Sequence, residues 1–171
     1  MTVSLYHASV PVFRQMLGGL SAVMDKAAAH AEAKKIDPAV LTSARLYPDM
    51  FPFTRQVMIA TDHAKGSSAR LAGVEVPKFE DTETTFAELK ARIQKTLDFI
   101  GGLKSAQFDG AESREVVIPL RGEQQKFTGR AYLFHFALPN FYFHTTTAYD
   151  ILRHCGIEIG KRDFMHQLIT E

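Results

Sequence analysis

The sequence predicts a mainly helical protein, an antiparallel four-helix bundle with a β-hairpin or extended excursion before its last helix. Four segments repeat apolar residues every three or four positions, which lines one face of a helix. The segment before the last of them is instead rich in β-branched residues, as strands are. A chain of 171 residues with 46% apolar content buries one sizeable core, so we expect a single domain over residues 1–171.

The first long helix is predicted to begin at Val10 and to end near Lys35. A short helix should follow from Pro38 to Arg45, because Asp37 is a good N-cap residue and proline is suited to a first helical turn. The apolar stripe of the long helix consists of Val10, Phe13, Leu17, Leu20, Met24 and Ala27.

The second long helix is predicted to begin near Pro52 and to end at Gly73, since glycine readily adopts the left-handed conformation that terminates helices. Asp62 and His63 are neighbours on it, and consecutive residues diverge by about 100° around a helix. They therefore cannot both face the core. The inner face consists of Val57, Ala60, Ala64 and Leu71.

The third long helix should begin after Thr85, because Thr85 and Glu88 have the spacing of a capping box. Gly101 and Gly102 end its apolar pattern. Glu88 and Arg92 lie one turn apart in the favourable order, acid before base, which indicates a solvent-exposed flank.

A hairpin is expected after this helix. Residues 115–120 are predicted to form a strand, residues 121–125 with Gly122 a turn, and the chain to return from Lys126. Pro119 cannot donate to a sheet ladder, so its strand should lie at an edge.

Residues 132–138 are apolar and aromatic and fit either a strand or a helix. The last helix is predicted over residues 139–154, ended by Gly156. Asn140 and His144 share one stripe of this helix, which should face the interior. Paired polar groups at this spacing can hold a metal or a substrate, or His144 can be a buried histidine that bonds to a carbonyl or hydroxyl group.

Other polar residues extend the candidate site. Gln56 and Tyr149 would join Asn140 and His144 in a pocket between the second and the last long helix. His63 is either solvated or a metal ligand. Arg153, with Lys161 and Asp163 near the end of the last helix, would bind an anion or form a structural ion pair.

Composition argues against several classes of function. Twenty basic and nineteen acidic side chains give a net charge of +1 without a basic run, so nucleic acid is not an expected partner. No apolar stretch approaches the roughly 18 residues of a membrane helix, and the first residues do not resemble a signal peptide. The single Cys155 excludes an intramolecular disulfide and a thiolate-built zinc site. We therefore expect a cytoplasmic protein.

Three segments, LPNFYFHTTTAYDILRHCGIEIGKRDF, PDMFPFTRQVMIATDHAKG and FEDTETTFAELKARI, resemble a bacterial family of unknown function within the DinB/YfiT-like helical superfamily. The resemblance covers nearly the whole chain. It implies an up-down-down-up four-helix bundle, often dimeric. Relatives hold a divalent metal such as zinc or nickel with three histidines, one on the second helix and an HxxxH pair on the last, and some are thiol-dependent transferases or hydrolases.

By this resemblance His144 corresponds to the second histidine of the pair, and Asn140 stands where the first would be. Gln56 is the first candidate for the helix-two position and His63 the second. A neutral amide is a poor ligand for zinc or nickel, so we expect such a site to bind metal weakly or not at all.

Two functions remain open at this point. The first is a pocket that binds a small molecule, with or without a divalent metal, and that supports catalysis or not. The second is a non-catalytic homodimerisation module with a degenerate metal site, in which the aromatic residues between Phe134 and Phe143 pack within or between subunits.

Overall fold

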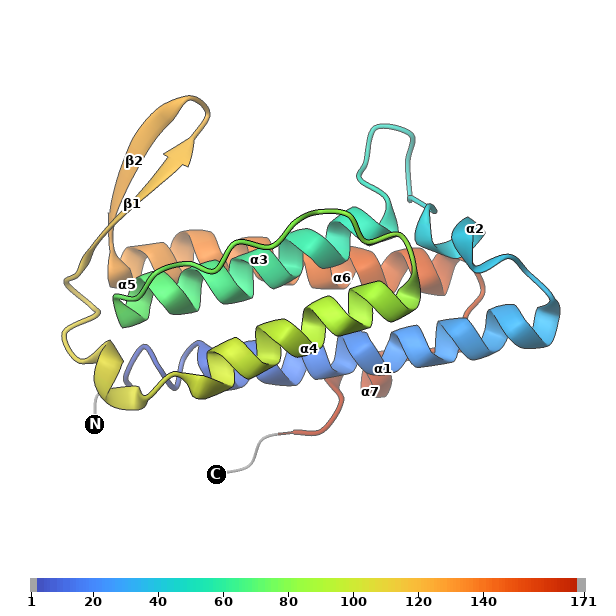
Figure 1. Ribbon diagram of the computed structural model, residues 1–171, viewed down its shortest axis with the longest axis horizontal. Helices are drawn as coiled ribbons and strands as arrows, with labels where there is room; N and C mark the ends of the chain where they lie inside the picture. Colours follow the sequence, from blue (N-terminus) through green and yellow to red (C-terminus); the bar gives the residue numbers. More distant parts are fainter. Residues whose placement is uncertain (1–2, 169–171) are drawn as a thin grey trace.

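Four long helices form the body of the protein in a computed structural model that describes residues 3–168 (Figure 1). Helices α1 and α6 run one way along the long axis, and α3 and α4 run the other way (Figure 1). Helix α3 packs against α4 and α6, and so does α1. The helices predicted from apolar periodicity therefore exist and share one core. Their bounds are α1 Val10–Lys34, α3 Phe53–Ala72, α4 Phe86–Gly102 and α6 Leu138–His154.

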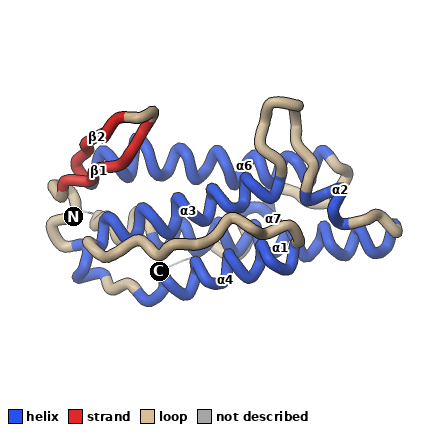
Figure 2. The backbone as a smooth tube through the Cα atoms, turned by 45° about the horizontal axis from the view of Figure 1, so that its top comes forward, coloured by secondary structure: helices blue, strands red, loops and turns tan. Residues whose placement is uncertain are grey.

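Shorter elements connect these helices (Figure 2). Helix α2 is capped as predicted, because the Ala39 N–H donates to Asp37 Oδ1 at 2.9 Å. It ends three residues earlier than predicted, where the Ser43 hydroxyl donates to the Ala39 carbonyl at 2.7 Å. The short elements are α2 Pro38–Thr42, the 3₁₀ turn η1 Ser105–Phe108, β1 Glu115–Leu120, β2 Glu123–Thr128, α5 Gly129–Tyr132, the π-helical turn η2 Leu133–Ala137 and α7 Lys161–Met165.

The β1–β2 hairpin rises from one end of the helices (Figure 1), and its side chains Val116 and Ile118 are buried in the core. Its strands pair antiparallel, with Glu115 opposite Thr128. The predicted five-residue turn is wrong, because only Arg121 and Gly122 form the turn and β2 begins at Glu123. Both turn residues have positive φ, 53° and 86°, which is the two-residue geometry whose twist matches a hairpin.

Residues 132–138, which fitted either a strand or a helix, are helical. Helix α5, the turn η2 and helix α6 follow one another without a break. The π-helical turn immediately precedes the first turn of α6, where Pro139 lacks an N–H and its ring disturbs the α-helical pattern. There the Asn140 side-chain amide donates to the Phe136 carbonyl at 2.7 Å, so this side chain stabilises the backbone.

Helices α3 and α4 run in the same direction, so the linker of residues 73–85 must return along the length of α3 (Figure 1). Arg92 of α4 attaches this linker to the helices through hydrogen bonds and ion pairs. The Arg92 side chain is only 1% exposed, which contradicts the solvent-exposed flank predicted for it. Glu88 instead completes the capping box with Thr85. Arg92 donates to the Thr61 hydroxyl (2.8 Å) and the Glu80 carbonyl (2.8 Å), and pairs with Asp62 (2.9 Å), Asp81 (3.0 Å) and Glu83 (3.1 Å).

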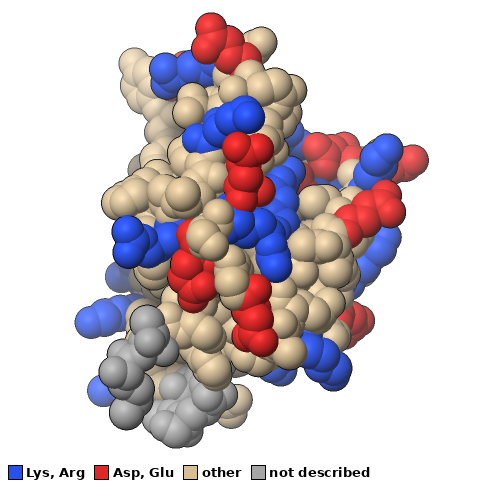
Figure 3. Space-filling model, turned by 90° about the vertical axis from the view of Figure 1, so that its left-hand side faces the viewer, with Lys and Arg blue, Asp and Glu red and all other residues tan. Residues whose placement is uncertain are grey.

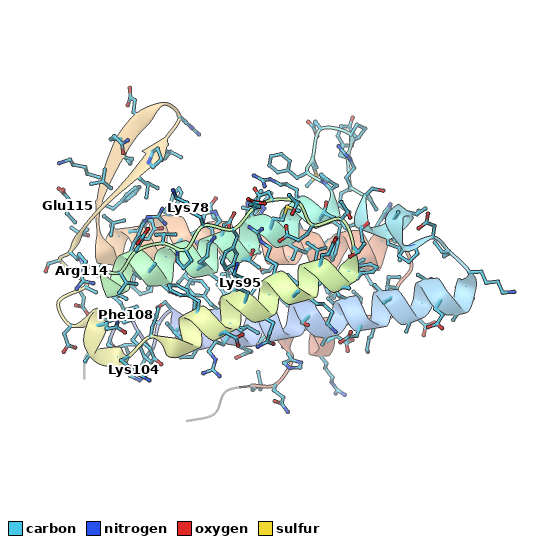
Figure 4. The ribbon with its side chains drawn as sticks, viewed as in Figure 1. Lys78, Lys95, Lys104, Phe108, Arg114 and Glu115 are labelled. Atoms are coloured by element: carbon cyan, nitrogen blue, oxygen red, sulfur yellow. The ribbon has the colours of Figure 1, made fainter. Side chains whose placement is uncertain are left out.

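Particular residues explain the end of α3 and the close packing at the middle of α1. Gly73 terminates α3 in the left-handed conformation, φ 71°, as predicted. Arg114, at the base of the hairpin (Figure 4), donates to the Leu71 carbonyl in the last turn of α3. Gly19 in the middle of α1 is required by packing, because a Cβ there would collide with the Phe164 carbonyl of α7.

The surface agrees with the nearly balanced charge. On the face shown in Figure 3, acidic and basic side chains lie beside one another. No helix within residues 3–168 combines the length and the hydropathy needed to cross a bilayer.

Candidate functional site between α3 and α6

A buried hydrogen bond joins Gln56 in the first turn of α3 to His144 in the middle of α6. Gln56 is 1% exposed and His144 8%. His144 Nδ1 lies 2.7 Å from Gln56 Oε1, and Gln56 Nε2 donates to the Phe51 carbonyl at 3.2 Å. His144 thus points into the interior beside a polar neighbour, as the helical stripe predicted, although the neighbour comes from α3.

The bond determines the protonation of the His144 ring. An amide oxygen can only accept, so Nδ1 must carry the proton and Nε2 of the neutral ring keeps its lone pair. Burial, and next the nearby Arg55 charge, lower the pKa of His144 from 6.5 to about 4. The ring is therefore neutral at physiological pH, with one nitrogen available as a hydrogen-bond acceptor or metal ligand.

His63 joins this site from α3, where it follows Gln56 by seven residues. Its ring centroid lies 6.0 Å from that of His144, and the two rings are 15° from parallel. Burial lowers the pKa of His63 to about 4, and the His144 and Arg70 charges act in the same direction while Asp62 opposes them. Of the two alternatives for His63, the structure shows a half-buried ring facing α6. Asp62 turns away toward Arg92, as adjacent helical residues must.

Aromatic rings surround the two histidines. The ring centroid of Phe136 lies 5.7 Å from that of His63. The ring of Phe143 is perpendicular to that of His144, with the two centroids 5.2 Å apart. Tyr132 stacks on Phe136 at 5.7 Å and accepts a hydrogen bond from Arg70 Nη1 at 3.3 Å. The imidazoles are thus held between apolar walls with a cation at one end.

Two of the predicted site residues lie elsewhere. The Tyr149 hydroxyl donates to the Ile159 carbonyl at 3.5 Å, and its ring packs against Phe164. Arg153 is exposed near the end of α6. At 100° per residue, Tyr149 and Arg153 are turned about 140° and 180° from His144, so neither can share its face. Asp163 pairs with Lys26 of α1 at 2.6 Å, not with Arg153 or Lys161.

The donor atoms do not fit a three-histidine metal site. Within residues 3–168, no group of three or more histidine, cysteine, aspartate or glutamate side chains is arranged to hold a metal ion. His63 and His144 are two imidazoles, and Asn140 donates its amide to a backbone carbonyl. The Gln56 amide is engaged at both ends. The first candidate for the helix-two ligand therefore orients His144 instead.

Arg70 and Phe136 are the residues that sequence reasoning missed. Gln56, His63 and Arg70 repeat every seven residues, a spacing that places all three on one face of α3. That polar repeat could have identified Arg70. No comparable pattern identifies Phe136, because its position depends on the π-helical turn.

Comparisons with known proteins identify a family and a similar solved structure. The model of a domain of unknown function, DUF1993, matches residues 5–165. The crystal structure of a DinB family member protein from Shewanella denitrificans is 44% identical, with a TM-score of 0.91, over 98% of this chain and 94% of that chain. No curated protein matches the sequence significantly.

Proposed function

We propose that this protein is a DinB-type four-helix bundle that binds a small molecule between α3 and α6. The chain belongs to the DUF1993 family. This match, together with the DinB family neighbour, bears out the resemblance seen in the sequence. The binding groups are His63 and His144. The up-down-down-up course of the four long helices supports the bundle assignment (Figure 1).

The observation that carries the proposal is the Gln56–His144 hydrogen bond. It fixes both the tautomer and the orientation of a neutral ring, which is how proteins prepare an imidazole to bind a partner. With a pKa of about 4, His144 is a poor partner for a carboxylate and a weak base. Its Nε2 is suited to accept a hydrogen bond from a hydroxyl, thiol or amide group of a ligand.

A ligand screen tests the proposal. Ligand-observed NMR with a set of small hydroxyl, thiol and amide compounds should find binders of the wild type that His144→Ala no longer binds. His154→Ala removes an exposed histidine from the same helix and should retain them. The proposal is wrong if His144→Ala binds these compounds as the wild type does, or if the wild type binds none of them.

We further propose that the site acts without a divalent metal, because two imidazoles and two engaged amides fall short of the ligand set that zinc or nickel requires. Metal analysis by mass spectrometry on untagged protein, purified without chelator, should find no stoichiometric metal. Near-stoichiometric zinc or nickel that disappears in His144→Ala would overturn this and favour a metalloenzyme.

A second candidate function is a dimerisation module. It is favoured by the aromatic side chains that α6 and the turn before it expose, since Phe134 is 45% and Phe143 57% accessible. Large exposed aromatic groups mark protein interfaces more often than free surface. In this case the buried histidines serve packing, and His144→Ala lowers stability without affecting any ligand.

A further inference from the structure

Arg70 is a cation that has no acidic partner in the described part of the chain, residues 3–168. Its side chain is half-buried, and the hydrogen bond of Nη1 to the Tyr132 hydroxyl uses one of its five donors. Within residues 3–168, no carboxylate lies within 4.0 Å of Arg70, whereas the neighbouring cations Arg55, Lys65 and Arg92 all have one. A partly desolvated guanidinium that lacks a carboxylate is suited to receive one from a ligand.

The Arg70 guanidinium lies directly against Gly66 of α3. A Cβ at Gly66 would lie 2.6 Å from Arg70 Nη1, so the guanidinium rests against the bare backbone of α3 one turn from His63. A glycine inside a helix destabilises it relative to alanine. The missing side chain leaves room for the Arg70 guanidinium beside the backbone of α3. The Arg70 charge also contributes to the lowered pKa of His63.

A cleft of about 750 Å³ opens beside Arg70, between α3 and residues 76–81 of the linker. Its size is in the range of small-molecule sites. Lys78 lines it from the linker, alongside α3 (Figure 4). Of the three acidic side chains in its lining, Asp62 and Asp81 are paired with other cations, and Glu80 lies more than 4.0 Å from Arg70.

We propose that Arg70 is the receptor for an anionic group, a carboxylate or a phosphate, on a small molecule that occupies this cleft. This inference goes beyond the proposed function, because neither His63 nor His144 lines the cleft.

Titration with inorganic phosphate tests the role of Arg70. At constant ionic strength, phosphate added to the full-length protein should shift the NMR signals of the Arg70 side chain and of His63. Arg70→Gln should weaken the binding about tenfold or more. Equal affinities of wild type and Arg70→Gln, or no binding by the wild type, would overturn the inference.

Gly66→Ala is the second variant, chosen because alanine favours a helix and the atom nearest the added Cβ is the flexible end of the Arg70 side chain. It should raise the melting temperature by about 2–4 °C, through the better helix propensity of alanine, while it displaces the guanidinium and weakens phosphate binding. Arg153→Gln, which removes an exposed arginine outside the cleft, should bind phosphate as the wild type does. Undiminished binding by Gly66→Ala would count against the inference.

The two proposals fail in different ways. If the inference about Arg70 is wrong, wild type and Arg70→Gln have the same affinity for phosphate. The hydroxyl, thiol and amide compounds still bind the wild type and not His144→Ala. If the histidine site is wrong, no such binder depends on His144, while phosphate still binds through Arg70. Retained phosphate binding by His144→Ala is expected, since that imidazole does not contact the anion.

Discussion

Single residues at this site have properties that follow from their neighbours. A histidine free in water has a pKa of 6.5, and burial lowers the pKa of His144 to about 4. The acceptor opposite Nδ1 is an amide, so nothing restores the charged form. A carboxylate in the same place would favour the imidazolium ion.

Gln56→Glu therefore changes the character of His144 with almost no change of shape. We expect the pKa of His144 to rise by about 1–3 units, because a carboxylate would accept the Nδ1 proton and stabilise the charged ring. An NMR titration of the histidine signals measures this. Gln124→Glu makes the same change on exposed β2 and should leave the pKa of His144 unaltered; an equal rise in both variants would contradict the local contact.

Stability should fall in acid within a defined window. The pKa values of His63 and His144 are about 4 in the folded protein and about 6.5 in the unfolded chain, so the unfolded chain takes up protons first. The stabilisation is complete above pH 6.5 and is lost as the pH falls toward 4. For the pair we expect a loss on the order of 2 kcal/mol after allowing for solvent screening.

Urea unfolding measured at several pH values tests this window. Stability of the wild type should decline between pH 6.5 and 4, and His144→Gln should decline less steeply there. His154→Gln should follow the wild type, because His154 is exposed. The carboxylates of Asp81 and Asp163, whose pKa values are lowered by their cationic partners, should contribute only below about pH 4.

Among the elements, the linker of residues 73–85 is the one that most needs side-chain contacts to attach it to the helices. A long return segment between two parallel helices has few apolar side chains to hold it, and Arg92 supplies the attachment. Phe79 of the linker adds to it, since its ring lies 3.8 Å from Lys65 Nζ and 4.2 Å from Lys95 Nζ, within the range of cation–π contacts.

Replacing Arg92 by methionine should release this linker. We expect a loss of about 2–3 kcal/mol, at the lower end for a buried ion pair because Asp62 and Asp81 keep 40% and 38% of their exposure and can be hydrated again. Urea unfolding measures the loss, and limited proteolysis should cut the linker faster. Lys90→Met removes an exposed pair with Asp25 and should cost less than about 1 kcal/mol. Equal losses would refute the attachment.

At the scale of the whole molecule, the aromatic surface of α6 and the turn before it is the feature that most needs explanation. The hairpin and the loop before α3 both rise on one side of the helices (Figure 1). Several large apolar side chains remain exposed on the hairpin, this loop, η2 and α6, namely Tyr47, Phe51, Val117, Leu120, Phe134, Tyr142 and Phe143.

If this surface joins two copies, light scattering should give the mass of two chains. Phe134→Ser should shift the protein toward the monomer, because it removes exposed apolar area from the contact. Val40→Ser removes an apolar side chain from α2 that is more exposed than Phe134, and it should not shift the protein toward the monomer. A monomeric wild type at micromolar concentration would rule out the dimerisation module.

The sequence by itself determined the four long helices and the presence of the hairpin. The capping residues Asp37 and Thr85, the terminator Gly73 and the apolar stripes act within a few residues of the chain, so the helix bounds could be predicted from them closely. It also indicated that His144 faces inward.

Only the tertiary structure decided which side chains meet. Gln56 and His144 are 88 residues apart, and Thr61 and Arg92 are 31 apart. Such contacts depend on how each helix is rotated about its axis and how far it slides along its neighbour. These quantities are set by the packing of the whole core and leave no local pattern in the chain. For the same reason Arg92, which local spacing placed on the surface, is buried, and Tyr149 and Arg153 lie away from the site.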